Sequence, residues 1–438
     1  MAALEALPPG TRALRVHGLG DDALPALQRL RGLESLEMHG SVRVMLTSRP
    51  QALVVSLTDS AFANLARISK LRRLCLDTHP ALTGAGLDAL QRLPVLEALA
   101  LRNLDVVDSH LDALSRLPSL TELDLSFNYG VRGEGITALQ ACGGLRRLTL
   151  RGCPQLDGAD VARLGTLSRL DFLDLSDLDG RRWRPDFDLR AVAGVDIATR
   201  TTDDKVTFSL GDFQAPDTFG LPFDAMRLES AERRWQLRRL HYRHLAQTAA
   251  RSRRHELDDA ALGSLAAAPL RELRLSPGSY TAAGLHALRA ARTLEVLVLD
   301  GGGLNASMAE GLPRTLHTLV VRGGIDDATC VALRSAAPRL RHLELPGSTA
   351  LTTAGLAELV QIEDLRRLDL RGCAGLLPTA IGILSRAHRL EELDLRDVPW
   401  VVGSQLDHLR STLPGLRKLD GGTTSTAPHP STWMLRGR

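Results

Sequence analysis

Residues 365–384 read LRRLDLRGCAGLLPTAIGIL, and this stretch begins with leucines at the first, fourth and sixth positions of the pattern LxxLxL. The same pattern recurs through most of the chain. Counted between first leucines, the steps are 25, 24, 25 and 25 residues from Leu71 to Leu170, and 24, 22, 24, 25, 25 and 26 residues from Leu270 to Leu416. So constant a spacing indicates one structural unit repeated many times.

This period is typical of leucine-rich repeats, in which each unit is a short strand followed by a helix. One unit cannot bury its leucines alone, so neighbouring units stack into a solenoid with a continuous core. Between the leucine patterns lie phrases such as LTTAGLAEL at 351–359, where Thr352 can cap a helix whose apolar residues follow at helical spacing. We therefore predict an α/β fold, a horseshoe-shaped leucine-rich-repeat solenoid with a parallel concave sheet, convex helices and a non-repeat interruption.

The spacing also predicts how the chain divides into segments. The step from Leu33 to Leu71 is about 13 residues longer than a repeat. The surplus holds two apolar runs around Pro50, which indicates an inserted β-hairpin. The predicted segments are an N-terminal cap with this hairpin (1–60), a repeat array (61–180), a non-repeat insertion (181–236), a second repeat array (237–420) and a disordered tail (421–438).

The insertion and the residues after it have an unusual composition. Residues 183–242 hold eight of the 15 aromatic residues of the chain, Trp183 and Trp235 among them. Eight arginines, including Arg239, follow within residues 233–255, without an acidic residue before Glu256. One interpretation is an aromatic and basic platform for a partner, more suited to an acidic or phosphorylated protein than to nucleic acid. The other is a folded plug that shields the edges of the repeats.

Composition and charge indicate the type of genome that encodes the protein and the compartment in which it resides. The net charge is +3, and nearly all basic residues are arginine, since the lysines are only Lys70, Lys205 and Lys418. This preference for arginine over lysine is typical of a GC-rich bacterial genome. The alternative explanation is that few lysines avoid ubiquitin attachment in a eukaryotic cell. Five cysteines without paired spacing favour a reduced compartment. Without a signal-peptide pattern or a membrane-spanning run, we expect a bacterial cytoplasmic protein or one exported into a host cell by another route.

The candidate binding residues follow from the strand positions that face away from the core. Positions five and seven of the pattern form an acidic column beside an arginine column near the C-terminal end, and neighbouring strands lie about 4.8 Å apart. These side chains therefore form a charge ladder that either contacts a partner or neutralises itself. The predicted partner-binding residues, including those of the insertion, are Asp124, Arg151, Asp174, Arg274, Arg322, Glu344, Asp369, Arg371, Asp394, Arg396, Trp183, Trp235 and Arg239.

Catalytic and metal-binding motifs are not found in the sequence. It contains no GxxxxGK[ST], HExxH, GxSxG or CxxC pattern. His17, His39 and Asp77 share position seven of early units and could ligate a metal together, but we expect the inserted hairpin to separate Asp77 from the histidines. We therefore predict a protein that is not an enzyme, with no catalytic residue, cofactor or metal. An enzyme with a catalytic insert is the alternative.

Position nine of the pattern carries small polar side chains in several repeats. Asn128, Cys153 and Cys373 stand there, the two cysteines within the matching phrases LRRLTLRGC and LRRLDLRGC. A small polar side chain at this position can satisfy backbone groups of the turn that leaves the strand. We therefore predict that these residues have a structural role.

The phrases at 365–384 and LTGAGLDALQRL at 82–93 resemble cysteine-containing and ribonuclease-inhibitor-like leucine-rich repeats. Their GxxAL character is similar to the repeats of plant-pathogen type III effectors, including the GALA group of F-box effectors. This resemblance implies a secreted effector or scaffold that binds a host protein through its concave face, through residues 181–256, or through both. We expect the protein to be a monomer. It also implies the alternative of a substrate-recognition component of a ubiquitin ligase, although the N-terminus shows no helical segment like an F-box.

Overall fold

The computed structural model describes residues 4, 6–45, 51–55, 57–79, 81–104, 106–128, 130–153, 155–178, 197–202, 205–210, 213–214, 259–275 and 280–422. The chain separates into two compact units, Met1–Thr293 (unit 1) and Leu294–Arg438 (unit 2). Within the described ranges, none of the helices has the length and apolar character needed to cross a membrane.

Unit 1 is built on a parallel sheet whose strands follow one another in sequence order. Each strand keeps its repeat positions in register with the next, so that Leu123 lies beside Leu148. The described strands of this sheet are β1 (Ala13–His17), β2 (Ser35–His39), β5 (Arg73–Asp77), β6 (Ala98–Arg102), β7 (Glu122–Asp124), β8 (Arg147–Thr149), β9 (Phe172–Leu175) and β13 (Glu272–Leu275).

The sheet of unit 1 continues across the interruption. β9 pairs in parallel with β13, and Leu173 lies opposite Leu273 although 100 residues separate them. The 3-stranded antiparallel sheet of β10 (Ile197–Thr202), β11 (Lys205–Leu210) and β12 (Phe213–Gln214) belongs to the interruption. Trp183, Trp235 and Arg239 lie outside the described residues, as do the predicted restart of the repeats at 237 and the tail after 422.

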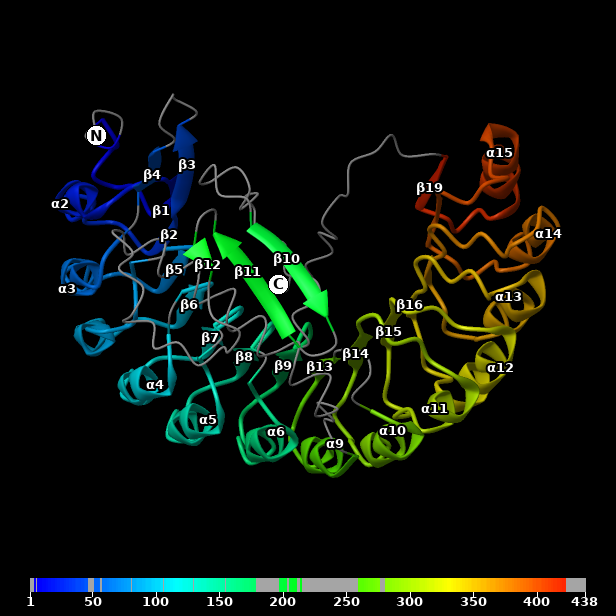
Figure 1. Cartoon of the computed structure of the whole chain (residues 1–438). Coiled ribbons are helices and arrows are strands. Elements are labelled where there is room, and N and C mark those ends of the chain that lie inside the picture. Colours follow the sequence, from blue (N-terminus) through cyan, green and yellow to red (C-terminus); the bar gives the residue numbers. More distant parts are fainter. Residues whose placement is uncertain are drawn as a thin grey trace. The chain divides into compact units, whose positions relative to one another are not determined.

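A second antiparallel pair occurs where the inserted hairpin is expected. β3 (Ser41–Met45) pairs with β4 (Gln51–Val55), with Val42 opposite Val54. Helices connect the parallel strands and run along one side of them (Figure 1). In unit 1 they are η1 (Asp21–Ala23), α2 (Leu24–Leu27), α3 (Ser60–Leu65), η2 (Leu87–Arg92), α4 (Asp108–Ser115), α5 (Gly133–Leu139), α6 (Gly158–Leu164), α9 (Asp259–Ala266) and α10 (Ala282–Leu288).

Unit 2 repeats the same arrangement without an interruption. Its parallel strands are β14 (Val296–Leu299), β15 (Thr318–Val321), β16 (His342–Glu344), β17 (Arg367–Asp369), β18 (Glu392–Arg396) and β19 (Lys418–Gly422). Its helices are α11 (Ala306–Glu310), α12 (Asp327–Ala336), α13 (Thr353–Leu359), α14 (Ala380–Leu384) and α15 (Gly403–Thr412). Parallel strand and helix repeats in both units confirm the predicted α/β leucine-rich-repeat solenoid.

The leucines of the pattern form the core of the repeats. Leu340, Leu343 and Leu345 occupy positions one, four and six of one repeat, and each is fully buried. Burial of one such side chain contributes about 1.5 to 3 kcal/mol. The next helix is held by Thr352, which caps α13 by accepting from the Ala354 N–H at 3.1 Å, as predicted. Its hydroxyl in turn donates to Asp327 of the preceding repeat at 2.6 Å, so that adjacent repeats are also joined on the helix side.

The polar residues of position nine satisfy backbone groups, as predicted. The Asn128 amide donates to the carbonyl oxygens of Leu101 and Leu125 at 2.6 and 2.9 Å, and its oxygen accepts from the Leu104 and Val106 N–H groups. In later repeats one thiol replaces the amide. Sγ of Cys153 and Sγ of Cys373 donate to the Leu125 and Leu345 carbonyl oxygens, each at 3.2 Å.

His79 stands at the same position nine of an earlier repeat, and sequence reasoning missed its role. It is fully buried. Its Nδ1 accepts from the Leu57 N–H and its Nε2 donates to the Met38 carbonyl oxygen, both at 3.2 Å. The bond that Nδ1 accepts requires a neutral ring, and burial lowers the pKa of His79 to about 4. Its place at position nine, counted from Leu71 as position one, was the signal that could have identified it.

Folding stability should therefore fall on acidification because of His79. In the unfolded chain the ring has its ordinary pKa of 6.5 and binds a proton as the pH falls below that value. In the folded state the ring stays neutral until the pH approaches 4. The contribution is thus complete above pH 6.5 and is lost as the pH falls toward 4, to a total of about 3 kcal/mol. Urea unfolding across this pH range would measure the effect. The His79→Asn variant keeps a donor and an acceptor but does not titrate, so its stability should fall less; equal pH dependence would contradict this prediction.

Candidate functional site

The exposed side of the sheet in unit 2 carries a row of charged side chains, here called the charged face. Its centre is the column of position five, where the strand register places Glu344, Asp369, Asp394 and Asp420 in sequence on neighbouring strands. Position three flanks this column on one side and position seven on the other. The flanking charged or titratable residues are His342, Arg367, Glu392 and Lys418 at position three, and Arg371 and Arg396 at position seven.

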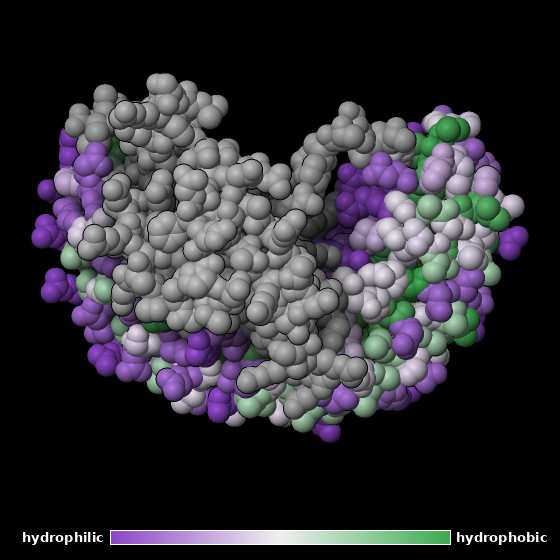
Figure 2. Space-filling view, in the orientation of Figure 1, coloured by the Kyte–Doolittle hydropathy of each residue, from purple (hydrophilic) through white to green (hydrophobic). Residues whose placement is uncertain are grey.

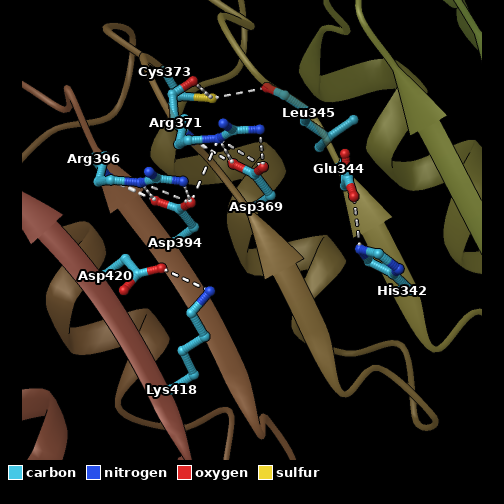
Figure 3. Close-up of polar contacts among 10 residues, drawn as sticks. All are labelled: His342, Glu344, Leu345, Asp369, Arg371, Cys373, Asp394, Arg396, Lys418 and Asp420. Atoms are coloured by element: carbon cyan, nitrogen blue, oxygen red, sulfur yellow. Dashed lines mark hydrogen bonds and ion pairs between the residues drawn. The ribbon is translucent and has the colours of Figure 1, made fainter. Parts of the chain in front are cut away.

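Each arginine of position seven is clamped by the aspartate two residues before it. Arg371 Nε donates to both carboxylate oxygens of Asp369, at 3.0 and 2.8 Å, and its backbone N–H donates to Oδ1 at 2.9 Å. Arg396 repeats this geometry on Asp394, with both Nε distances at 3.0 Å. The carboxylate therefore fixes both the strand end and the direction of the guanidinium group (Figure 3).

The clamps are linked across strands. Arg371 Nε also lies 3.5 Å from Oδ2 of Asp394 on the next strand, so this guanidinium group bridges two repeats. The predicted charge ladder is thus formed. The carboxylates of Asp369 and Asp394 largely neutralise the guanidinium groups of Arg371 and Arg396. The arginine side chains remain 23% and 26% exposed, whereas those of Asp369 and Asp394 are 10% and 11% exposed. What a partner would meet here is therefore oriented guanidinium groups over buried carboxylates.

The environment shifts the pKa of the carboxyl groups in different directions. Burial raises the pKa of Asp369, and the hydrogen bonds from Arg371 offset only part of this effect. Burial acts the same way on Glu344, but the hydrogen bond from His342, with Nε2 at 3.0 Å, and the nearby arginines hold the pKa of this carboxyl below its usual value. Hydrogen bonds and charge contacts with Asp369 raise the pKa of Arg371 despite its burial.

The position-three residues complete the face with more exposed pairs. Arg367 Nε lies 3.2 Å from Glu392, and Lys418 Nζ lies 3.1 Å from Asp420. The depression between these side chains has room for about one water, ≈ 30 Å³, whereas small-molecule sites usually hold several hundred. In the view of Figure 2, hydrophilic residues gather beside the C-terminal strands of unit 2. The depression is therefore too small to enclose an organic molecule.

The predicted binding residues of unit 1 also have intramolecular partners. Asp124 accepts from Arg102 Nε at 2.6 Å. Asp174 accepts from the Ser176 hydroxyl at 2.6 Å and lies 3.9 Å from Arg274 Nη1. The Arg274 guanidinium also lies 5.3 Å from the centre of the Phe172 ring, within cation–π range.

Two further predicted arginines lie on other strands. Arg151 of unit 1 has its guanidinium 5.7 Å from the Phe127 ring centre and 3.9 Å from Asp177 Oδ2. In unit 2, Arg322 Nη1 lies 3.3 Å from Asp300 on the preceding repeat. The structure therefore brings Glu344, Asp369, Arg371, Asp394 and Arg396 together on neighbouring strands. Arg322 lies beside this group, since its charge also lowers the pKa of Glu344, whereas Arg151 belongs to a separate pair.

The strand register places His17, His39 and Asp77 in one column, as their shared position seven indicates. The His17 and His39 rings stack with their centroids 4.6 Å apart, and His39 Nε2 lies 2.7 Å from Glu37. β2 pairs directly with β5, which places Asp77 opposite His39, with Oδ2 3.6 Å from Nδ1. The expected separation of Asp77 was wrong, because the hairpin leaves the sheet after β2 and the chain returns before α3. Among the described residues, no group of three or more His, Cys, Asp or Glu could hold a metal ion.

Position three was the part of the charged face that sequence reasoning missed. His342, Arg367, Glu392 and Lys418 were absent from the predicted residues although they line the same depression as the acidic column. The signal was available, because side chains two residues apart on a strand share one face of a sheet. Their pairing with position five could not be predicted from that spacing alone.

No protein-family model matches the sequence, and no curated protein matches it either. Among solved structures, the chain is similar to an internalin, InlF, of Listeria monocytogenes, with 16% identity, coverage of 97% of this chain and 93% of that chain, and a TM-score of 0.46. It is also similar to the yeast Rad7 and Elc1 complex, with 16% identity, 96% and 84% coverage and a TM-score of 0.46. For the TLR13–ssRNA13 complex the values are 16%, 97% and 65%, and 0.45.

Proposed function

We propose that this protein is a non-enzymatic scaffold that binds a protein partner through the charged face of unit 2. The observation that carries the proposal is the linked pair of clamps, in which Asp369 and Asp394 hold Arg371 and Arg396 in fixed directions on an exposed sheet. Side chains that are already ordered lose little conformational entropy when a partner binds. Their alternating charges favour specificity for a surface with the complementary pattern.

We further propose that the partner is a host protein and that the chain is a bacterial type III secreted effector. The support for this finer role is the resemblance of the repeat phrases to effector repeats and the arginine-rich, lysine-poor composition. The depth of the charged face also supports a scaffold over an enzyme, since a depression of ≈ 30 Å³ cannot enclose an organic substrate. Residues 181–256 remain a second proposed contact region, on the basis of their aromatic and basic composition.

Removal of the contact that links the two clamps, between Arg371 and Asp394, should weaken partner binding. Partners would first be captured from a plausible host lysate and identified by mass spectrometry, and the dissociation constant of the purified partner would then be measured. The double variant Asp394→Ala and Arg371→Ala should weaken binding by about tenfold or more, because it removes an oriented guanidinium group and the carboxylate that links two repeats. Unchanged affinity in this variant would contradict the proposal.

A matched control is available on the helix side of the same unit. Arg334 and Glu358 form an ion pair between neighbouring helices, with Nη1 2.9 Å from Oε2. The double variant Arg334→Ala and Glu358→Ala also removes one pair between repeats, but it should leave the affinity unchanged. A chain without residues 181–256 then separates the two proposed contact regions: a partner retained by this chain binds the charged face, and a partner lost only here binds the insertion.

A further inference from the structure

The last strand of unit 2 ends the sheet with one side unpaired among the described residues. β19 pairs with β18 in parallel, with Lys418 opposite Glu392 and Asp420 opposite Asp394. β19 is the terminal strand in the order of the sheet, and no described strand lies on its other side (Figure 1). Unpaired sheet edges of this kind are templates for pairing with another strand.

The direction of the free backbone groups follows from the preceding repeats. The Leu370 N–H donates to the Asp394 carbonyl oxygen and the Gly372 N–H donates to the Arg396 carbonyl oxygen, both at 2.9 Å. Position six and position eight therefore direct their N–H groups toward the following repeat. Since these directions alternate along a strand, Leu419 and Gly421 of β19 direct their N–H and carbonyl groups toward the open side.

The apolar layer behind β19 is also less covered than in the repeat before it. Leu390 and Leu393, at positions one and four of the β18 repeat, are each only 1% exposed. The equivalent Leu416 and Leu419 of the β19 repeat are only partly buried. A strand added beside β19 would therefore gain backbone hydrogen bonds and cover leucine surface at the same time.

We propose that β19 pairs in antiparallel orientation with β19 of a second copy of this chain, with the two-fold axis at Leu419. In this register Leu419 lies opposite its own copy, and Lys418 of each chain lies opposite Asp420 of the other. Two opposite-charge pairs then form on the charged face, each favourable for an antiparallel pair. A register centred on Asp420 would instead place like charges opposite each other. The edge is thus self-complementary, and the protein associates as a dimer where sequence reasoning expected a monomer.

Charge exchange at the edge tests this register. Sedimentation velocity of the full chain, from low to high micromolar concentration, should show a reversible dimer. Lys418→Asp or Asp420→Lys alone places like charges in both symmetric pairs and should weaken the dimer by about 3-fold to 30-fold. The double variant Lys418→Asp and Asp420→Lys restores both pairs between chains and also keeps the pair within each chain, which measures 3.1 Å. It should therefore recover the affinity of the unmodified protein.

The control is Arg367→Asp, which makes the same charge change at position three of an interior strand. β17 is paired on both sides, by β16 and β18, so this variant should dimerise like the unmodified protein. Three results would overturn the proposal: a monomer at every concentration, as expected if another segment covers the edge; a dimer that the single variants leave unchanged; or single variants whose loss the double variant does not restore. None of these results depends on the proposed binding of a host protein.

Discussion

Replacement of Leu343 by alanine should lower the free energy of unfolding by about 2 to 5 kcal/mol. Leu343 is fully buried at position four of β16, between Leu319 and Leu368 of the neighbouring strands. Its removal takes away apolar contacts and leaves a cavity that close-packed neighbours fill only in part. Because each repeat is stabilised by the repeats beside it, the loss should spread to both neighbours. Urea unfolding of both proteins under the same conditions would measure the difference.

The matched control for this variant is Leu377→Ala in the same unit. Leu377 is 60% exposed, so the same change of side chain should alter the free energy of unfolding by no more than about 0.5 kcal/mol. A small loss at Leu343, similar to that at Leu377, would show that the leucine column does not form a cooperative core.

Replacement of Asn128 by leucine is the second variant for which a large loss is expected. Asn128 is fully buried, and its amide makes four hydrogen bonds to backbone groups of two repeats. Leucine leaves all four groups without this partner, and each unsatisfied buried group costs about 1 to 3 kcal/mol. We expect a loss of about 3 kcal/mol or more in the free energy of unfolding, again measured with urea.

Asn128→Cys separates hydrogen bonding from side-chain volume at this position. Cysteine stands at the equivalent position of the next repeat, where Sγ of Cys153 donates to the Leu125 carbonyl oxygen. Asn128→Cys should therefore be less destabilising than Asn128→Leu, because one backbone carbonyl keeps a donor. If the leucine variant were as stable as the cysteine variant, the hydrogen bonds would not explain why polar residues occupy position nine.

The repeat architecture could be predicted from local sequence because every repeat presents the same pattern. A leucine at positions one, four and six has one way to be buried, which is to face a neighbour with the same spacing, as Leu340, Leu343 and Leu345 do. The cap at Thr352 depends on a backbone group within one turn of the chain and needs no knowledge of distant contacts. The Asn128 amide has one such local partner, Leu125, whereas its other three backbone partners belong to the preceding repeat.

Several features were decided only by the tertiary structure. β9 and β13 pair across 100 residues because the stacked leucines on either side of the interruption align. The regular LxxLxL spacing is lost in the sequence between these two strands. Asp77 lies opposite His39 because the inserted hairpin leaves the plane of the sheet. In both cases strands separated by a long stretch of sequence pair directly, so spacing along the chain gives no measure of distance in space.

The charged face depends on both the sequence pattern and the tertiary structure. By itself, the sequence determined which residues stand in columns, because a strand alternates its faces every two residues and the repeats share one period. The tertiary structure decided that Asp369 clamps Arg371 and that Arg371 also reaches Asp394. The physical reason is that ion-pair geometry depends on side-chain conformation and burial at each strand end, whereas hydrophobic periodicity depends only on which face of the strand is covered.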